Sequence, residues 1–297
     1  MPSDPSIVDA HHHVWDVAVR PQPWLDTDGA LAPLRRSFLI PDLIPQAAAV
    51  GVAATVVVQT LVETVETPEL LSLAASGPLV TAVVGWTDLT SPAVADALGE
   101  LRAMPGGQRL AGIRHPLLTE PDPDWLDRPD TRRGLSGLAT AGLTFDLVLR
   151  PGQLPAAVRT AASLPDLRFV LDHLGNVDVS RSEPDPAWVA AFVALASLPN
   201  TVCKLSGIFS VPAPDGAPGS PRDADRSIAH LRPYLDLALD SFGPDRLMFG
   251  SDWPVCTLGA SYADVVTAAV ALTSTLSSPE QAAILGGTAR AVYRIRD

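Results

Sequence analysis

The chain has 297 residues, 47% of them apolar, so it can bury a large core, and disorder and a disulfide-stapled mini-protein are both excluded. It carries 33 acidic against 21 basic residues, a formal net charge of −12, and no basic run longer than the pairs 35–36 and 132–133. Nucleic acids and anionic membranes are therefore poor partners for this protein.

Short β-branched runs alternate with longer Ala- and Leu-rich stretches of helical spacing along the whole chain. The predicted strands, in chain order, are 7–14, 54–60, 80–86, 110–115, 143–149, 168–173, 201–205 and 246–251. The predicted helices are 40–50, 68–75, 93–104, 131–141, 156–163, 186–198, 228–241 and 262–276. Strict alternation of eight pairs predicts one TIM-type (β/α)₈ barrel over residues 1–297. The alternative, an open doubly wound sheet, lacks the expected G-x-G-x-x-G after its first strand.

Polar residues stand at the carboxyl ends of most predicted strands, and in a barrel these ends share the face that carries the active site. Two segments, 16–39 and 209–226, are too long for simple turns and are expected to cover the substrate. The composition of the second segment is equally compatible with a disordered insertion.

A His-x-His pair, His11 and His13, ends the first strand, with His12 between them. Side chains alternate along a strand, so His11 and His13 are expected to face the lumen and His12 to face away. Two imidazoles on one face suit a divalent cation, although a hydrogen-bonded structural pair is the alternative.

Asp252 follows the last strand, which neighbours the first in a closed barrel, so its carboxylate is expected near the two histidines. There it can complete a metal site and act as general base toward a bound water. An Asx turn is the local alternative for an aspartate at this position.

The sixth strand ends in Asp172 and His173, of which strict alternation admits only one to the lumen. We expect His173, as a third ligand or as the proton donor to a leaving oxygen. A buried structural histidine bonded to Asp172 or Asp146 is the alternative.

Further candidates for binding substrate come from other strand ends and loops. On the fourth strand either Arg114 or His115 faces inward, and the sequence does not decide between them. Lys204, after the seventh strand, is either buried or solvated. Aromatic and guanidinium groups suited to sugar rings and carboxylates are present at Trp24, Trp86, Trp253 and Arg35.

The sequence lacks the motifs of several other kinds of functional site. No phosphate-binding G-x-x-x-x-G-K-[ST] and no G-x-S-x-G elbow occurs in the sequence. Cys203 and Cys256 are expected to be core residues in a reducing cytoplasm, not a catalytic thiol or a disulfide. No export signal or membrane anchor is expected, since the longest near-apolar run, 47–58, falls short of the ~18 residues that span a bilayer.

Seven motifs in this order resemble the amidohydrolase-2 branch of the amidohydrolase superfamily: Asp-Ala-His-His-His-Val-Trp-Asp, Val-Val-Gln, Val-Val-Gly-Trp-Thr-Asp-Leu, Gly-Ile-Arg-His, Leu-Asp-His-Leu-Gly-Asn, Cys-Lys-Leu-Ser-Gly and Phe-Gly-Ser-Asp-Trp-Pro-Val. The similarity runs from residue 8 to about residue 254. It is strongest to the group of sugar-lactone and pyrone-dicarboxylate lactonases, which implies a distorted barrel that hydrolyses a small-molecule lactone.

The resemblance also implies roles for residues. His11 and His13 match the family's His-x-His, His173 its sixth-strand histidine and Asp252 its eighth-strand aspartate; Arg114 and His115 match its substrate contacts. Two-metal members carry a carboxylated lysine on the fourth strand, where this chain has Arg114-His115, so one metal at most is expected. Members differ in their need for it, which leaves a single Zn²⁺ or no cofactor open.

The expected mechanism has Asp252 deprotonating a water that attacks the lactone carbonyl, while His173 or protonated Asp252 protonates the ring oxygen. The same branch contains zinc-dependent decarboxylases of aromatic or muconate-type acids, which form the alternative function. A non-catalytic barrel that binds a small ligand is the other. The sequence does not indicate whether the protein forms a homo-oligomer.

Overall fold

The computed structural model describes residues 7–181, 183–208 and 221–296. Eight parallel strands form one sheet in sequence order, each paired with the next along the chain. The strands are β1 (Ile7–His12), β2 (Val52–Val58), β3 (Val80–Gly85), β4 (Leu110–Pro116), β5 (Thr144–Val148), β6 (Phe169–Leu171), β7 (Thr201–Leu205) and β8 (Leu247–Phe249). All eight predicted strands are present, several of them shortened at the carboxyl end.

The sheet closes into a barrel just beyond β8. The amide of Asp252 donates to the carbonyl of His11 at 2.8 Å, and the amide of His13 donates to the carbonyl of Trp253 at 2.7 Å. The prediction of a TIM barrel is therefore confirmed. These closing bonds also bring the residues after β8 beside the end of β1.

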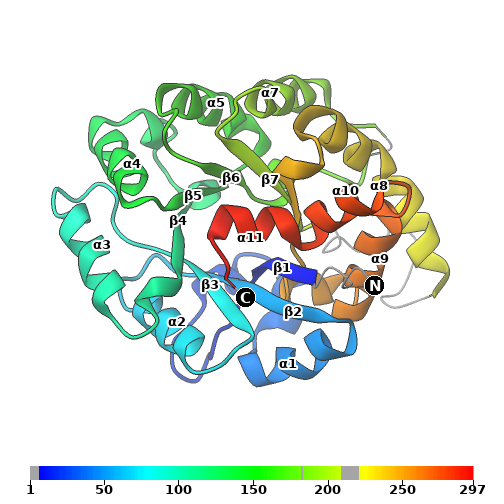
Figure 1. Ribbon diagram of the computed structural model, residues 1–297, viewed down its shortest axis with the longest axis horizontal. Helices are drawn as coiled ribbons and strands as arrows, with labels where there is room; N and C mark the ends of the chain where they lie inside the picture. The colour runs from blue at the N-terminus through cyan, green and yellow to red at the C-terminus, as the bar shows by residue number, and fades with distance from the viewer. Residues whose placement is uncertain (1–6, 182, 209–220, 297) are drawn as a thin grey trace.

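Helices form the outer layer around the strands (Figure 1). Those predicted from the sequence are α1 (Ile40–Ala49), α2 (Glu66–Ala75), α3 (Val94–Ala103), α4 (Pro129–Ala141), α5 (Leu154–Ser163), α7 (Pro186–Ala196), α8 (Pro221–Phe242) and α9 (Tyr262–Thr273). Their ends follow capping chemistry: Asp185 accepts from the first amides of α7, and Ser261 forms a capping box with Asp264 at α9. A left-handed glycine, Gly142 with φ 63°, ends α4.

Two C-terminal helices were not predicted from the sequence, α10 (Ser278–Ala282) and α11 (Thr288–Tyr293), which are joined by a π-helical turn. In Figure 1, α11 lies across the barrel axis. Its residues Ala289 and Tyr293, with Ile295 just beyond its end, belong to the same buried cluster as the lumen side chains of the strands, so it plugs the barrel. These helices are too short to show a clear helical period in the sequence.

The strands separate two apolar layers. The lumen is filled mainly by small side chains such as Ala10, Ala54 and Val170, whereas the larger ones, such as Phe145 and Phe249, pack outward against the helices. This alternation lets each strand residue be assigned to the lumen or to the helix layer, which decides the makeup of the site.

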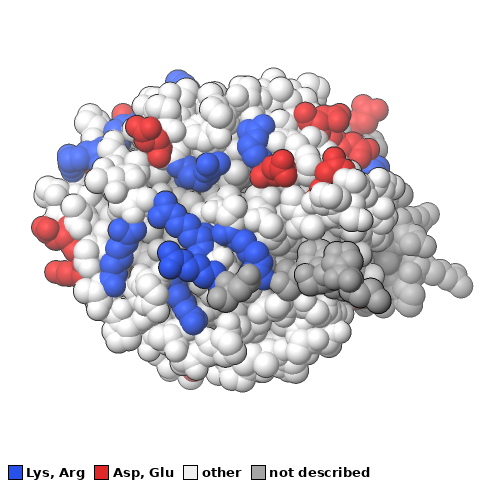
Figure 2. All heavy atoms as spheres, in the orientation of Figure 1, with Lys and Arg blue, Asp and Glu red and all other residues white. Residues whose placement is uncertain are grey.

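Basic side chains gather around the barrel axis on the face that Figure 2 shows. Arg109 donates to the carbonyls of Ala74 and Gly77 at the end of α2, and Arg246 donates to that of Ala196 at the end of α7. Cations at helix C-termini compensate unpaired carbonyls and the negative end of the helix dipole. These two arginines therefore have a structural role.

The first long segment, 16–39, follows β1 and contains two 3₁₀ turns, Pro23–Asp26 and Gly29–Leu34. It is held to the barrel by the Trp15–Phe38 bridge and by Arg20, which pairs with Glu69. Most of the second segment, 209–226, lies outside the described residues. None of the described helices is long and apolar enough to cross a membrane.

Candidate active site

A β-bulge in β1 arranges the three histidines. Asp9 is in register with Thr55 of β2, but His12 is in register with Val57, so β1 contains one extra residue between these pairs. His11 and His13 consequently point into the lumen, while the ring of His12 contacts Thr55 Oγ1 at 2.9 Å. The predicted division of the three histidines between the two faces agrees with their positions here.

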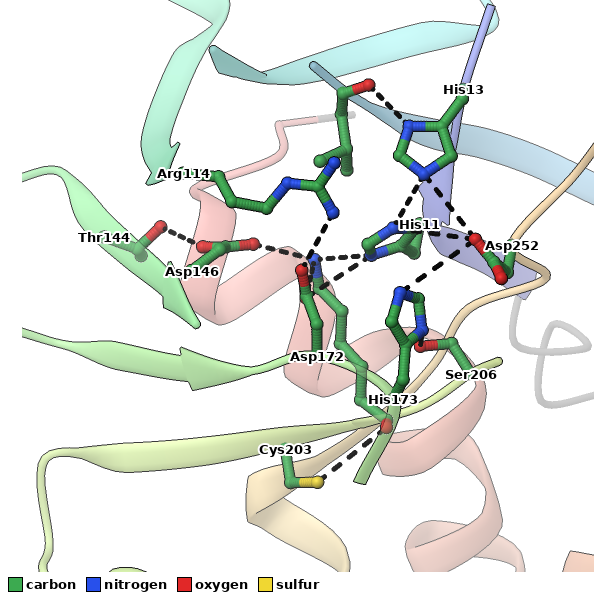
Figure 3. Close-up of polar contacts among 12 residues, drawn as sticks. His11, His13, Arg114, Thr144, Asp146, Asp172, His173, Cys203, Ser206 and Asp252 are labelled. Atoms are coloured by element: carbon green, nitrogen blue, oxygen red, sulfur yellow. Dashed lines mark hydrogen bonds and ion pairs between the residues drawn. The ribbon is translucent and has the colours of Figure 1, made fainter. Parts of the chain in front are cut away.

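His11, His13 and Asp252 converge at one point of the barrel mouth (Figure 3). The two Nε2 atoms lie 3.2 Å apart, and Asp252 Oδ1 lies 3.5 Å from that of His13 and 3.9 Å from that of His11. His13 Nδ1 donates to the carbonyl of Val58 at 2.8 Å, so its Nε2 is left with a free lone pair. Three acceptor atoms thus surround a position suited to a cation.

The donor set fits a divalent metal. Two nitrogen ligands of a tetrahedral zinc, each at about 2.0 Å, stand about 3.3 Å apart, close to the separation of the histidine Nε2 atoms. Imidazole nitrogen and carboxylate oxygen are both ordinary zinc ligands. His11, His13 and Asp252 are therefore the described residues that would hold the ion.

Asp252 adopts a left-handed backbone conformation, with φ 59°, after the turn that follows β8. Burial alone raises the pKa of its carboxyl, but the neighbouring side chains of His173, His13 and Arg114 outweigh burial, so the pKa is lowered below its ordinary value. The group is a carboxylate near neutral pH. It can accept a proton from a water at the mouth.

Both Asp172 and His173 contribute to the site, so the expectation that only one of them enters the lumen is wrong. β6 ends at Leu171, and Asp172 continues its alternation inward to lie 3.4 Å from His11 Nδ1. His173 has left strand geometry, with φ 54°, and this turn brings its ring 4.5 Å from that of His11. Strand periodicity stops applying where the strand stops.

His173 is oriented by one hydroxyl. Its Nδ1 lies 2.8 Å from Ser206 Oγ, and its Nε2 lies 4.0 Å from Asp252 Oδ1. The hydrogen-bond partner of this ring is therefore Ser206, instead of the predicted alternatives Asp172 and Asp146. Burial lowers the pKa of His173 in spite of the neighbouring carboxylates, so the ring is neutral at pH 7.

On β4, the inward residue is Arg114. Its Nη1 donates to Asp172 Oδ2 at 3.2 Å, and its Nη2 donates to the carbonyl and side-chain oxygens of Gln59. His115 points to the helix layer instead, where its ring stacks on Trp125 at 4.1 Å and bonds Glu120 at 2.8 Å. The choice that the sequence left open thus goes to Arg114 for the lumen.

The sequence left open whether Lys204 is buried or solvated; in the structure it is buried, with none of its surface exposed. Its Nζ lies 2.7 Å from Asp146 and 3.0 Å from Asp172. These contacts place Lys204 beneath the site and give it no surface with which to touch substrate.

The aromatic and guanidinium candidates from the loops and strand ends each have a defined contact. Trp86 donates to His115 Nδ1 at 3.2 Å. Trp24 is half-buried and packs edge-on against Trp15 at 5.4 Å, while Trp253 is 1% exposed and is a core residue. Arg35, in the first long segment, pairs with Asp26.

Asp9 and Ser206 also hold site residues, a role that was not predicted from the sequence. Asp9 accepts from the amides of His11 at 3.1 Å and Ser251 at 2.8 Å, and thereby ties β1 to the turn before Asp252. Their signal was weak: Asp9 precedes the His-x-His and Ser206 follows a strand-end lysine, positions that many residue types occupy.

The chain is similar to known proteins over nearly its whole length. The amidohydrolase family profile matches residues 8–295. The chain is 37% identical to an L-fucono-1,5-lactonase of Burkholderia multivorans, over 97% of this chain and 96% of the relative, and 34% identical to one of Burkholderia ambifaria, over 97% and 95%. It is also similar to the crystal structure of a zinc-bound amidohydrolase from Burkholderia multivorans, at 35% identity and a TM-score of 0.87, covering 98% of this chain and 99% of that one.

Proposed function

The chain belongs to the amidohydrolase family, and on that premise we propose that it is a lactonase that opens the ring of a neutral sugar-acid lactone. The observation that carries this proposal is the convergence of His11, His13 and Asp252 at the barrel mouth. L-Fucono-1,5-lactone, the lactone for which two relatives are named, is the first candidate substrate.

A divalent cation fits the site, with Zn²⁺ as the first candidate. When bound, such an ion supplies a Lewis acid for the lactone carbonyl and lowers the pKa of a water. Support comes from the two histidine Nε2 atoms, 3.2 Å apart, with the Asp252 carboxylate beside them. The zinc-bound relative supports the same choice.

Asp252 takes the first proton. A water oxygen attacks the carbonyl carbon of the lactone, and its proton passes to the Asp252 carboxylate, which the lowered pKa keeps ionised and available. The imidazoles of His11 and His13 border this position. Negative charge then develops on the carbonyl oxygen, and the bond between that carbon and the ring oxygen breaks.

His173 supplies the last proton. With Ser206 Oγ donating to its Nδ1, the neutral ring carries its hydrogen on Nε2, the atom that faces Asp252. That hydrogen passes to the departing ring oxygen, and the proton held by Asp252 restores the ring. The products are a hydroxyl and a carboxylic acid on one open chain, and the two side chains return to their starting states. The acid then releases its proton to solvent and becomes a carboxylate.

The charge balance of the site favours a neutral lactone over a dicarboxylated pyrone. Among the side chains that the structure describes at the site, the two cations, Arg114 and Lys204, are each paired with a carboxylate. A substrate carboxylate would have to compete with Asp172 for Arg114. Hydroxyl groups of a sugar ring need no such unpaired cation.

A pH-indicator assay tests the function, run on metal-analysed protein with neutral aldonolactones and 2-pyrone-4,6-dicarboxylate, with and without chelator and added Zn²⁺. We expect acid release from the neutral lactones, lost on chelation and restored by zinc. Activity that ignores chelator would overturn the metal and keep the lactonase. No acid release from any lactone, together with CO₂ release from aromatic acids, would overturn the function in favour of decarboxylation.

A matched pair of variants tests the site itself. His11→Gln removes an imidazole from the converging donors, whereas His12→Gln removes its neighbour on the other face of β1. We expect His11→Gln to lose zinc and at least ~10²-fold in kcat, and His12→Gln to retain both. Equal losses in the two variants would contradict the site.

A further inference from the structure

Beneath the converging donors lies a second layer of polar residues with almost no exposed surface. Three of its side chains have no exposed surface, Asp146, Asp172 and Lys204, and the fourth, Tyr293, is 3% exposed. We call these four residues the site floor; Figure 3 labels two of them, Asp146 and Asp172. Since buried charges are costly unless paired, the arrangement of this floor must be tightly determined.

Asp146 is the centre of the floor. Its Oδ2 accepts from the Tyr293 hydroxyl at 2.6 Å and from Lys204 Nζ at 2.7 Å, while its Oδ1 accepts from Thr144 Oγ1 at 2.9 Å. Asp146 is in register with Val170 of β6, two residues before Asp172, so it lies one lumen layer deeper. Three donors therefore fix this carboxylate below the reacting groups.

Lys204 connects Asp146 to the residues of the barrel mouth. Its Nζ lies 3.0 Å from Asp172 Oδ1 and 3.2 Å from His11 Nδ1, and the same Asp172 oxygen lies 3.4 Å from His11 Nδ1. The two neighbours stabilise opposite tautomers of His11. The Lys204 ammonium can only donate, so it favours an Nδ1 without a hydrogen, whereas the Asp172 carboxylate can only accept, so it favours an Nδ1 that carries one. The balance between them decides which ring nitrogen carries the hydrogen.

His11 presents a lone pair at Nε2 only when its hydrogen is on Nδ1, facing Asp172. That state requires Lys204 to direct its hydrogens at Asp146 and Asp172 instead of at His11. The 2.7 Å hydrogen bond from Lys204 Nζ to Asp146 points a Lys204 hydrogen away from His11, and the Tyr293 hydroxyl holds that Asp146 carboxylate in place. The C-terminal helix is thus connected to the ring that faces the substrate.

We propose that Tyr293 is a positioning residue for the reaction, which fixes His11 through Asp146 and Lys204. It comes from α11, which plugs the barrel. Its ring also lies 5.3 Å from Lys204 Nζ, within the range of a cation–π contact. The segment that plugs the barrel therefore also sets the geometry of its active site.

Tyr293→Phe tests the proposal, because it removes the hydroxyl and keeps the ring beside Lys204. Tyr234→Phe is the matched control: Tyr234 is fully buried, and its hydroxyl donates to the carbonyls of Asp178 and Arg181, away from the floor. Both variants lose a buried tyrosine hydroxyl, so a purely structural effect would appear in both.

Three readouts are compared. We expect Tyr293→Phe to weaken zinc binding by about 10- to 100-fold in a chelator competition, to lower kcat with KM for the lactone unchanged, and to shift the ring ¹⁵N signals of His11. Tyr234→Phe should change none of these. Wild-type values in Tyr293→Phe, or equal changes in both variants, would overturn the proposal.

The proposal rests on the proposed function only for the kcat readout. If the wild-type protein opens no lactone, that function has failed, while zinc binding and the His11 spectrum still decide the role of Tyr293. If the protein opens lactones without binding zinc, kcat and the His11 spectrum decide it. Unchanged His11 signals in Tyr293→Phe would overturn the positioning role in either case.

Discussion

Removing the Asp9 carboxylate should destabilise the fold and impair the site together. The side chain points from β1 toward the helix layer, where it accepts four hydrogen bonds. The donors are the amides of His11 and Ser251, the Ser251 hydroxyl and the Tyr262 hydroxyl. Asp9 thereby joins the first strand, the turn before Asp252 and α9.

The expected cost follows from these donors. Asp9→Ala leaves two buried backbone amides without an acceptor, each costing about 1–3 kcal/mol, so their sum is about 2–6 kcal/mol. The Ser251 hydroxyl retains a weaker acceptor, the carbonyl of His11 at 3.4 Å. Asp9→Asn keeps an oxygen for both amides and should cost only about 1–2 kcal/mol.

Urea unfolding followed by circular dichroism measures both costs, and lactone turnover measures the effect on the site. Because His11 and the turn before Asp252 both lose a fixed contact, kcat should fall by about tenfold or more in Asp9→Ala, and less in Asp9→Asn. If Asp9→Ala unfolded within 1 kcal/mol of wild type, or no more easily than Asp9→Asn, the reasoning from orphaned amides would be refuted.

Three further predictions concern the site and its surroundings. Asp252→Asn should lower kcat by ~10² or more without changing the far-ultraviolet spectrum, and wild-type turnover would end its role as base. Gly207→Ala should lower both stability and kcat, because φ is +71° there and a Cβ would lie 2.8 Å from the ring of His173; Gly99→Ala, with no heavy atom within 4 Å of its Cβ, should do neither. Burial lowers the pKa of His115 below its ordinary 6.5, so the unfolded chain binds a proton that the folded protein resists. Stability should therefore fall as the pH drops from 7.5 to 5.5, and less steeply in His115→Gln; equal slopes would contradict this.

The strand and helix pattern was readable because it is local. Each β-branched run and each amphipathic stretch carries its own period, and turn residues mark the ends, so the predicted strand 201–205 coincides with β7. The short C-terminal helices carry too few turns for a period. Their place across the barrel depends on contacts with strands far away in the sequence.

The mouth of the site was also partly readable. His11 and His13 are two residues apart on one strand, so local geometry brings them together, and barrel closure adds Asp252. The directions of Asp172 and His173 were predicted wrongly from strand alternation, because β6 ends at Leu171 and His173 no longer has strand geometry. Where regular structure ends, the sequence pattern no longer predicts direction.

By itself, the sequence determined the barrel, the family resemblance and the set of ionisable strand ends, since each depends on local periodicity or on residues in a fixed order. Tertiary structure alone decided which of those groups are free to act. Lys204 and Arg114 are paired inside the lumen with carboxylates from other strands, and Tyr293 reaches Asp146 from the far end of the chain. Pairing between buried charges depends on distances across the barrel, and those distances exist only once the barrel has closed.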